Sequence, residues 1–133
     1  MFHGEQYWAL ILGGSSGFGL ASAKKLSQCG MNIFLVHRDR RGAMVGIEEH
    51  FEEIRETGVA FQALNLDALS ANGRDEALAQ LKATIGEGRV RVLLHSIAAG
   101  RLKGFAPPGS AQSVDAVGRL ADSLGQSPDT IQK

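Results

Sequence analysis

The chain has 133 residues, with 14 basic and 14 acidic side chains and a formal net charge of +0. This balance excludes the strong field of one sign that attracts nucleic acid or an anionic membrane surface. The first residues lack the pattern of a secretory signal, and no apolar run reaches the roughly 20 residues that cross a bilayer. The single cysteine, Cys29, allows no intrachain disulfide, so we expect a cytoplasmic protein without nucleic-acid or membrane partners.

Short apolar runs alternate with amphipathic stretches over the first hundred residues. In chain order they predict a strand over 7–12, a helix over 17–28, a strand over 32–37, a helix over 43–56, a strand within 59–66, a helix that begins at Asp67 or Ser70, and a strand over 90–95. Apolar strands separated by helices are typical of a parallel sheet covered on both faces. We therefore predict an α/β, Rossmann-like doubly wound sheet with strand order 3-2-1-4.

The apolar spacing of the helices predicts which side chains face the sheet. The inward sets are Leu20, Ala21, Ala23 and Leu26 in the first helix, Val45, Ile47, Phe51 and Ile54 in the second, and Ala77, Leu78, Leu81 and Ile85 in the third.

A glycine-rich turn over residues 13–19 (Gly-Gly-Ser-Ser-Gly-Phe-Gly) lies between the first strand and the first helix. A pyrophosphate must approach the backbone N–H groups at a helix N-terminus, and a β-carbon would hold it off. Gly13 permits a sharp exit from the strand, Gly17 permits close approach of the phosphates, and Gly19 lets the helix pack on the sheet. The alternative is a glycine turn that holds no ligand. The candidate cofactor-binding residues of the turn are Gly13, Ser15, Ser16, Gly17, Phe18 and Gly19.

The spacing Gly13-x-x-x-Gly17-x-Gly19 resembles the cofactor motif of the short-chain dehydrogenase/reductase family, although Leu12 stands where that family often has threonine. The resemblance covers about residues 7–105 and implies a dinucleotide-binding Rossmann domain over residues 1–105, the front portion of a family domain. We expect residues 106–133 to form a loop, a weak helix and a mobile tail.

The end of the second strand predicts which dinucleotide is preferred. Its tip, His37-Arg38, should meet the adenosine ribose, where a carboxylate selects NAD and a guanidinium pairs with the 2′-phosphate of NADP. Arg38 stands where similar NADP-dependent family members place an arginine, so NADP(H) is favoured over NAD(H). Asp39, the next residue, departs from the pattern of those NADP-dependent members. Asn65-Leu66 resembles the family's pair that contacts adenine, through the Asn side chain and a backbone N–H. For Asp67 a helix-capping role is favoured.

The end of the fourth strand, His95-Ser96-Ile97-Ala98, differs from the Asn-Asn-Ala-Gly run of most family members and resembles that of the enoyl-acyl-carrier-protein reductases. The resemblance implies that Ser96, Ile97 and Ala98 lie at the nicotinamide end of the cofactor, and that an enoyl thioester is reduced. Reduction of a 3-ketoacyl or other carbonyl substrate is the alternative. For His95 we favour a structural role over proton transfer.

The catalytic tyrosine and lysine of the family are not found here, since the only tyrosine is Tyr7 in the first strand. We assign no catalytic residue and no metal, and we expect the catalytic half outside these residues. The expected partners are the remainder of the reductase domain, in the same or another chain, and an acyl thioester on acyl carrier protein or coenzyme A. When complete, the reductase is expected to be a homo-oligomer. A non-catalytic nucleotide-binding subunit and an interaction module remain alternatives.

Overall fold

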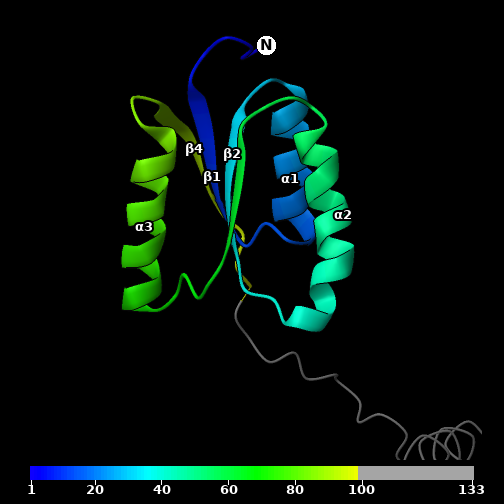
Figure 1. Ribbon diagram of the computed structural model, residues 1–133, viewed down its shortest axis with the longest axis vertical. Coiled ribbons are helices and arrows are strands. Elements are labelled where there is room, and N and C mark those ends of the chain that lie inside the picture. Colours follow the sequence, from blue (N-terminus) through cyan, green and yellow to red (C-terminus); the bar gives the residue numbers. More distant parts are fainter. Residues whose placement is uncertain (99–133) are drawn as a thin grey trace, which may run out of the picture. The chain divides into compact units, whose positions relative to one another are not determined.

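Four parallel strands form the centre of the computed structural model, which describes residues 1–98 (Figure 1). They are β1 (Tyr7–Leu12), β2 (Asn32–His37), β3 (Phe61–Asn65) and β4 (Arg89–His95), in the spatial order β3-β2-β1-β4. The predicted α/β class and strand order are confirmed. In the parallel register Leu12 lies beside both Val36 and His95, and His37 lies beside Asn65. The carboxyl ends of all four strands therefore meet at one edge of the sheet.

Helices cover both faces of this sheet. Helices α1 (Gly17–Gln28) and α2 (Met44–Arg55) lie on one face, and α3 (Ala71–Ile85) lies on the other (Figure 1). A short 3-10 turn, η1 (Arg41–Ala43), leads into α2. Ser70, one of the two residues predicted to open α3, is its N-cap, and its hydroxyl accepts from the N–H of Gly73 at 3.0 Å. Asp67 instead accepts from the N–H of Leu69 at 3.0 Å, so the favoured capping role of Asp67 is wrong.

Two apolar clusters hold the layers together, one on each face of the sheet. Successive side chains of a strand point to opposite faces. Ile33 and Leu35 therefore join Phe51 and Ile54 on the α1 and α2 face. Phe34, Val36 and Trp8 face α3, where they meet Ala68, Ala77 and Leu81. Because β2 is buried on both faces, its apolar run is continuous, as expected for a central parallel strand.

Three positions predicted to face the sheet are exposed instead: Ala21, Val45 and Leu78. The buried residues of α1 are Gly19, Ala23 and Ser27, spaced by four. Ala21 lies two positions from Ala23, and Val45 two positions from Ile47, which on a helix is a rotation of about 200°. The Ser27 hydroxyl donates to the Lys24 carbonyl at 2.8 Å, so this buried polar group is satisfied. Small residues thus bring α1 close to the sheet.

The predicted loop, weak helix and tail over 106–133, and the domain boundary at 105, lie outside the described residues. Within residues 1–98, β4 is an edge strand, and Leu93 on it is 67% exposed. No helix in this part of the chain combines the length and the apolar character that crossing a bilayer requires.

Candidate functional site

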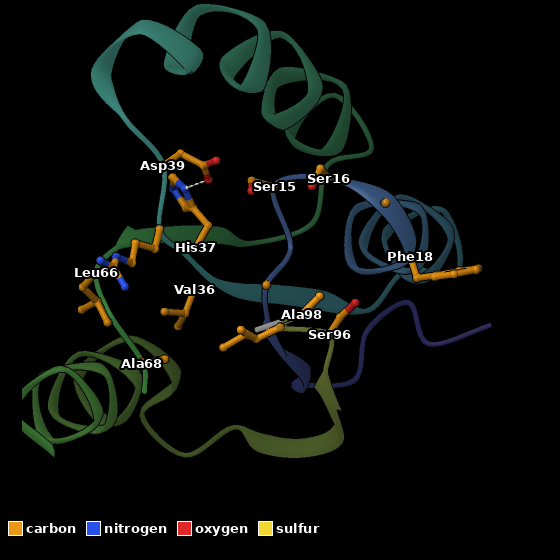
Figure 2. Close-up of a pocket in the computed structure, with 14 residues that line it drawn as sticks. Ser15, Ser16, Phe18, Val36, His37, Asp39, Leu66, Ala68, Ser96 and Ala98 are labelled. Atoms are coloured by element: carbon orange, nitrogen blue, oxygen red, sulfur yellow. Dashed lines mark hydrogen bonds and ion pairs between the residues drawn. The ribbon is translucent and has the colours of Figure 1, made fainter. Parts of the chain in front are cut away.

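A cavity of about 440 Å³ opens at the carboxyl edge of the sheet, where the segments that follow β1, β2, β3 and β4 meet (Figure 2). This volume lies in the range of small-molecule and cofactor pockets. In an open parallel sheet, ligands bind outside the carboxyl ends of the strands, at the point where the strand order reverses. Here that point lies between β1 and β4. The cavity is lined by Gly13, Ser15, Ser16, Gly17, Phe18, Val36, His37, Arg38, Asp39, Leu66, Ala68, Ser96, Ile97 and Ala98.

The glycine turn forms one wall of the cavity, and its glycines differ in what a β-carbon at each position would contact. Gly13 has φ +86°, and a β-carbon there would lie 2.6 Å from the carbonyl oxygen of Ser96. Gly17 has φ +55°, and a β-carbon there would meet nothing within 4 Å. Gly19 packs its α-carbon against the carbonyl of Gly13, where a β-carbon would collide. The turn is thus closely packed at Gly13 and Gly19, whereas Gly17, which also lines the cavity, has open space around its β-carbon position.

The N-terminus of α1 follows this turn. Ser16 occupies the N-cap position, but its hydroxyl makes no capping hydrogen bond. The first N–H groups of a helix have no partner within the helix, and together with the helix dipole they favour an anion. Figure 2 shows the side chains of Ser15 and Ser16 side by side on the turn, whereas the ring of Phe18 points away from the other labelled side chains. Phe18 is 88% exposed.

The tip of β2 carries a buried imidazole and two charged side chains. Nδ1 of His37 lies 2.8 Å from Oδ2 of Asp39, and the His37 side chain is 2% exposed because its ring packs edge-on against Phe51. The guanidinium of Arg38 forms an ion pair with Oδ2 of Asp67 at 3.1 Å and is otherwise largely open to solvent. Partial burial alone raises the pKa of the Asp39 carboxyl, but Ser15 and His37 outweigh it, so this pKa lies below its ordinary value.

Apolar side chains line the cavity between this tip and α3. Val36, Leu66 and Ala68 come from β2 and from the segment after β3 (Figure 2). The N–H of Leu66 donates to the carbonyl of His37 at 2.8 Å. The carboxamide of Asn65 holds the main chain of Asp39 through two hydrogen bonds of 3.0 Å. The two polar groups expected to meet an adenine edge therefore already have partners in the protein.

The segment after β4 forms the opposite wall. The N–H of Ser96 donates to the carbonyl of Leu12 at 2.7 Å, which extends the β1–β4 pairing by one residue. Ser96, Ile97 and Ala98 all line the cavity, and Ile97 also packs on the apolar cluster that faces α3. His95 pairs with Leu12 in the sheet and is exposed outside the cavity lining.

Eleven of the candidate binding residues line this one cavity, and two do not. Gly19 is buried beneath the turn, and Asn65 lies outside the lining. The list of binding residues predicted from the sequence did not include Val36, Asp39 and Ala68. The available signal for Val36 was its place beside His37 at the tip of the strand, while nothing local to Ala68 marked it. Tyr7 stands at the amino end of β1, with Arg91 5.3 Å from the centre of its ring. Among residues 1–98, no three His, Cys, Asp or Glu side chains gather as metal ligands.

The sequence model of the short chain dehydrogenase family matches residues 7–117, which include every element described above. The chain belongs to the short-chain dehydrogenase family. Members of this family are oxidoreductases that bind a nicotinamide dinucleotide. No curated protein matches the chain significantly.

Solved structures of short-chain dehydrogenases share this fold. One is a metagenomic short-chain oxidoreductase in complex with NADP, at 23% identity and a TM-score of 0.63, covering 84% of this chain and 48% of that one. A second is the bulky-bulky ketone specific alcohol dehydrogenase from Comamonas testosteroni, at 26% identity and a TM-score of 0.59, covering 88% of this chain and 47% of that one. A third is acetoin dehydrogenase from Enterobacter cloacae, at 21% identity and a TM-score of 0.62, covering 86% of this chain and 43% of that one. The chain spans less than half the length of each of these short-chain dehydrogenases.

The residues of the cavity fit a nicotinamide dinucleotide. Gly17 leaves the space that a β-carbon would fill beside the uncapped start of α1, which suits a pyrophosphate. Val36, Leu66 and Ala68 offer an apolar surface to an adenine ring at one end, and the small residues Ser96 and Ala98 lie at the other. The family's cofactor therefore has matching chemistry at each end of the cavity.

Proposed function

We propose that this chain is the cofactor-binding portion of an NADP(H)-dependent reductase of the short-chain dehydrogenase type. The observation that carries the preference for NADP(H) is the position of Arg38, which lines the cavity at the tip of β2 with its side chain 74% exposed. Its only ion pair among the described residues joins it to the half-exposed Asp67. Such a surface pair contributes about 0–1 kcal/mol, so the guanidinium can exchange it for a doubly charged 2′-phosphate.

Asp39 is the residue that argues for NAD(H), because a carboxylate near the ribose accepts hydrogen bonds from the 2′-OH. In this chain one Asp39 oxygen already faces the imidazole of His37, at 2.8 Å. That interaction competes with acceptance from a ribose hydroxyl. The balance supports NADP(H) over NAD(H).

For each part of the proposed cofactor there is a region of the cavity that would hold it. The turn over 13–17 and the start of α1 would hold the pyrophosphate, Leu66 and Val36 would contact adenine, and Ser96–Ala98 would lie at the nicotinamide ribose. When bound, the nicotinamide supplies hydride to a substrate or accepts it. The contribution of the described residues would be to bind and orient the cofactor.

For the reaction we propose reduction of an enoyl thioester carried by acyl carrier protein or coenzyme A. Its support is the run His95-Ser96-Ile97-Ala98, which resembles that of the enoyl-acyl-carrier-protein reductases and places Ile97 in the cavity wall. Carbonyl reduction is the second candidate, favoured by the likeness to a ketone-specific alcohol dehydrogenase. We further propose that catalysis requires the remainder of the reductase domain, in the same or another chain, and that the complete protein is a cytoplasmic homo-oligomer.

Calorimetric titration of this chain with NADPH and with NADH tests the cofactor proposal. We expect NADPH to bind at least tenfold more tightly; equal or reversed affinities would overturn the preference, and no binding of either would favour an interaction module. The reaction is tested on the protein purified from its native source, with crotonyl-coenzyme A and acetoacetyl-coenzyme A as substrates. Faster NADPH oxidation with the crotonyl thioester supports enoyl reduction, and faster oxidation with the acetoacetyl thioester supports carbonyl reduction.

A further inference from the structure

The side chain of Asn65, the last residue of β3, forms two hydrogen bonds with the backbone of Asp39, in the segment that follows β2. Its Oδ1 accepts from the N–H of Asp39 at 3.0 Å, and its Nδ2 donates to the carbonyl of Asp39 at 3.0 Å. The carboxamide thus acts as an additional peptide group that continues the β2–β3 pairing beyond the last backbone pair, His37 and Asn65.

The hydrogen-bonding capacity of Asn65 is nearly used up by these contacts. An Asn side chain has two N–H donors and one carbonyl acceptor. One donor goes to Asp39, and the other points at Sδ of Met44 at 3.6 Å. The N–H of Leu66 is engaged with the carbonyl of His37. The side-chain N–H groups of Asn65 and the backbone N–H of Leu66, the donors expected to meet a purine edge, therefore already have partners.

We propose that Asn65 is a positioning residue that sets the selectivity of the ribose end of the site. Arg38 stands between two residues whose main chains are both tied to β3: His37 through Leu66, and Asp39 through Asn65. The path of the chain at Arg38 is therefore fixed before a ligand arrives. The guanidinium is in turn directed toward Asp67, two residues beyond Asn65.

This fixed path favours a ligand that carries a 2′-phosphate. A binding group that is ordered in advance loses less conformational entropy on binding. The same hydrogen bonds hold Asp39, whose carboxylate faces His37 at 2.8 Å. When Asn65 no longer holds this peptide, Arg38 gains freedom and the Asp39 carboxylate can move toward the phosphate. A ligand without the 2′-phosphate depends on neither effect.

The inference rests on the proposed dinucleotide site, and its test separates the two. Isothermal titration with 2′,5′-ADP and with 5′-AMP, which lacks only the 2′-phosphate, is carried out on the unaltered chain, on Asn65→Ala and on Asn65→Gln. The matched control is Asn32→Ala, because Asn32 at the opposite end of β2 accepts from the N–H of Ala60 at 2.9 Å in the same side-chain-to-backbone manner. Hydrogen exchange of the Asp39 amide, followed by NMR, reports whether its bond to residue 65 is present.

We expect Asn65→Ala to weaken binding of 2′,5′-ADP about tenfold and of 5′-AMP less than about threefold, and to speed exchange of the Asp39 amide. Asn65→Gln keeps both kinds of polar group and should recover part of the lost selectivity. Asn32→Ala should leave the ratio of the two affinities unchanged. Equal losses for both nucleotides would mean that Asn65 contacts the shared adenine, or acts on the whole site, and would overturn this proposal alone. Failure of the unaltered chain to bind either nucleotide would overturn the proposed function as well.

Discussion

The α-carbon of Gly13 and the backbone of Ser96 are in such close contact that a β-carbon on Gly13 would lie 2.6 Å from the Ser96 carbonyl oxygen. Gly13 follows β1 and Ser96 follows β4, so the contact joins the glycine turn to the segment after β4, and both segments line the cavity. Two backbone hydrogen bonds hold these segments in place. The N–H of Gly13 donates to the carbonyl of Val36 at 2.7 Å, and the N–H of Ser96 donates to the carbonyl of Leu12 at 2.7 Å. The floor of the cavity is therefore a continuous piece of hydrogen-bonded backbone.

Gly17→Ala should separate cofactor binding from folding. Gly17 has φ +55° and lines the cavity, and a β-carbon there would meet no protein atom within 4 Å. We expect NADPH affinity to fall at least ~tenfold, because a methyl group holds a phosphate away from the N–H groups of α1. The positive φ costs about 1 kcal/mol of stability. Gly86→Ala is the control, since Gly86 has φ +53°, is equally open and lies at the end of α3, away from the cavity. Similar binding by both variants would contradict the pyrophosphate assignment.

Arg38→Gln should reduce NADPH affinity much more than NADH affinity. A charge-assisted hydrogen bond contributes about 1.5–3 kcal/mol, so we expect a loss of ~10-fold or more for NADPH and less than ~2-fold for NADH. Arg55→Gln is the control, because Arg55 also forms exposed ion pairs, with Glu48 and Glu52, but lies outside this cavity. The measurement is titration calorimetry with both cofactors. A parallel loss of both affinities in Arg38→Gln would show that Arg38 does not read the 2′-phosphate.

Phe51→Ala should destabilise the domain severely. Phe51 is 1% exposed, and the centre of its ring lies 5.4 Å from that of the His37 ring and 5.2 Å from that of the Phe61 ring. Removing it leaves a cavity, and the free energy of unfolding should fall by about 3–5 kcal/mol. Val45→Ala on the same helix should change it by less than ~0.5 kcal/mol, because Val45 is 76% exposed. Urea denaturation followed by the fluorescence of the single, buried Trp8 measures both. A large effect of Val45→Ala would place this side chain in the core after all.

Asp39 should make stability depend on pH in the acid range. The contacts with Ser15 and His37 lower the pKa of this carboxyl in the folded protein below its value in the unfolded chain. The stabilisation is therefore present above the ordinary pKa of about 4 and disappears as the pH falls through the lower folded pKa. The free energy of unfolding of Asp39→Asn should consequently be lower than that of the unaltered chain at pH 7, and this gap should narrow between about pH 5 and pH 2.

The control for this experiment is Asp75→Asn, which removes an exposed carboxylate on α3. At pH 7 its free energy of unfolding should differ from that of the unaltered chain by less than ~0.5 kcal/mol, as expected for an exposed substitution. Denaturation with urea at each pH provides the free energies. A gap for Asp39→Asn that does not change with pH would show that the carboxylate is not stabilised in the folded protein.

Local sequence was enough for the elements and for most of the site. Alternation of apolar runs with amphipathic stretches predicted every strand and α-helix of residues 1–98, although not the 3-10 turn η1. It also predicted the order 3-2-1-4, because the parallel arrangement and crossover handedness leave few alternatives. The glycine spacing located the turn for a physical reason: φ +86° at Gly13 and φ +55° at Gly17 are conformations that other residues rarely adopt.

Only the tertiary structure decided which groups are free to act. Asn65 and Leu66 were correctly placed at the end of a strand, but their polar groups are engaged by Asp39 and His37, which come from a different strand. Val45 was assigned inward as part of the apolar stripe of its helix, whereas Ile47 and Phe51 pack into the core and leave Val45 exposed to solvent. Periodicity and turn chemistry are local properties that a sequence carries directly. The partner of a hydrogen bond depends on which strands become neighbours, and that is settled when the sheet forms.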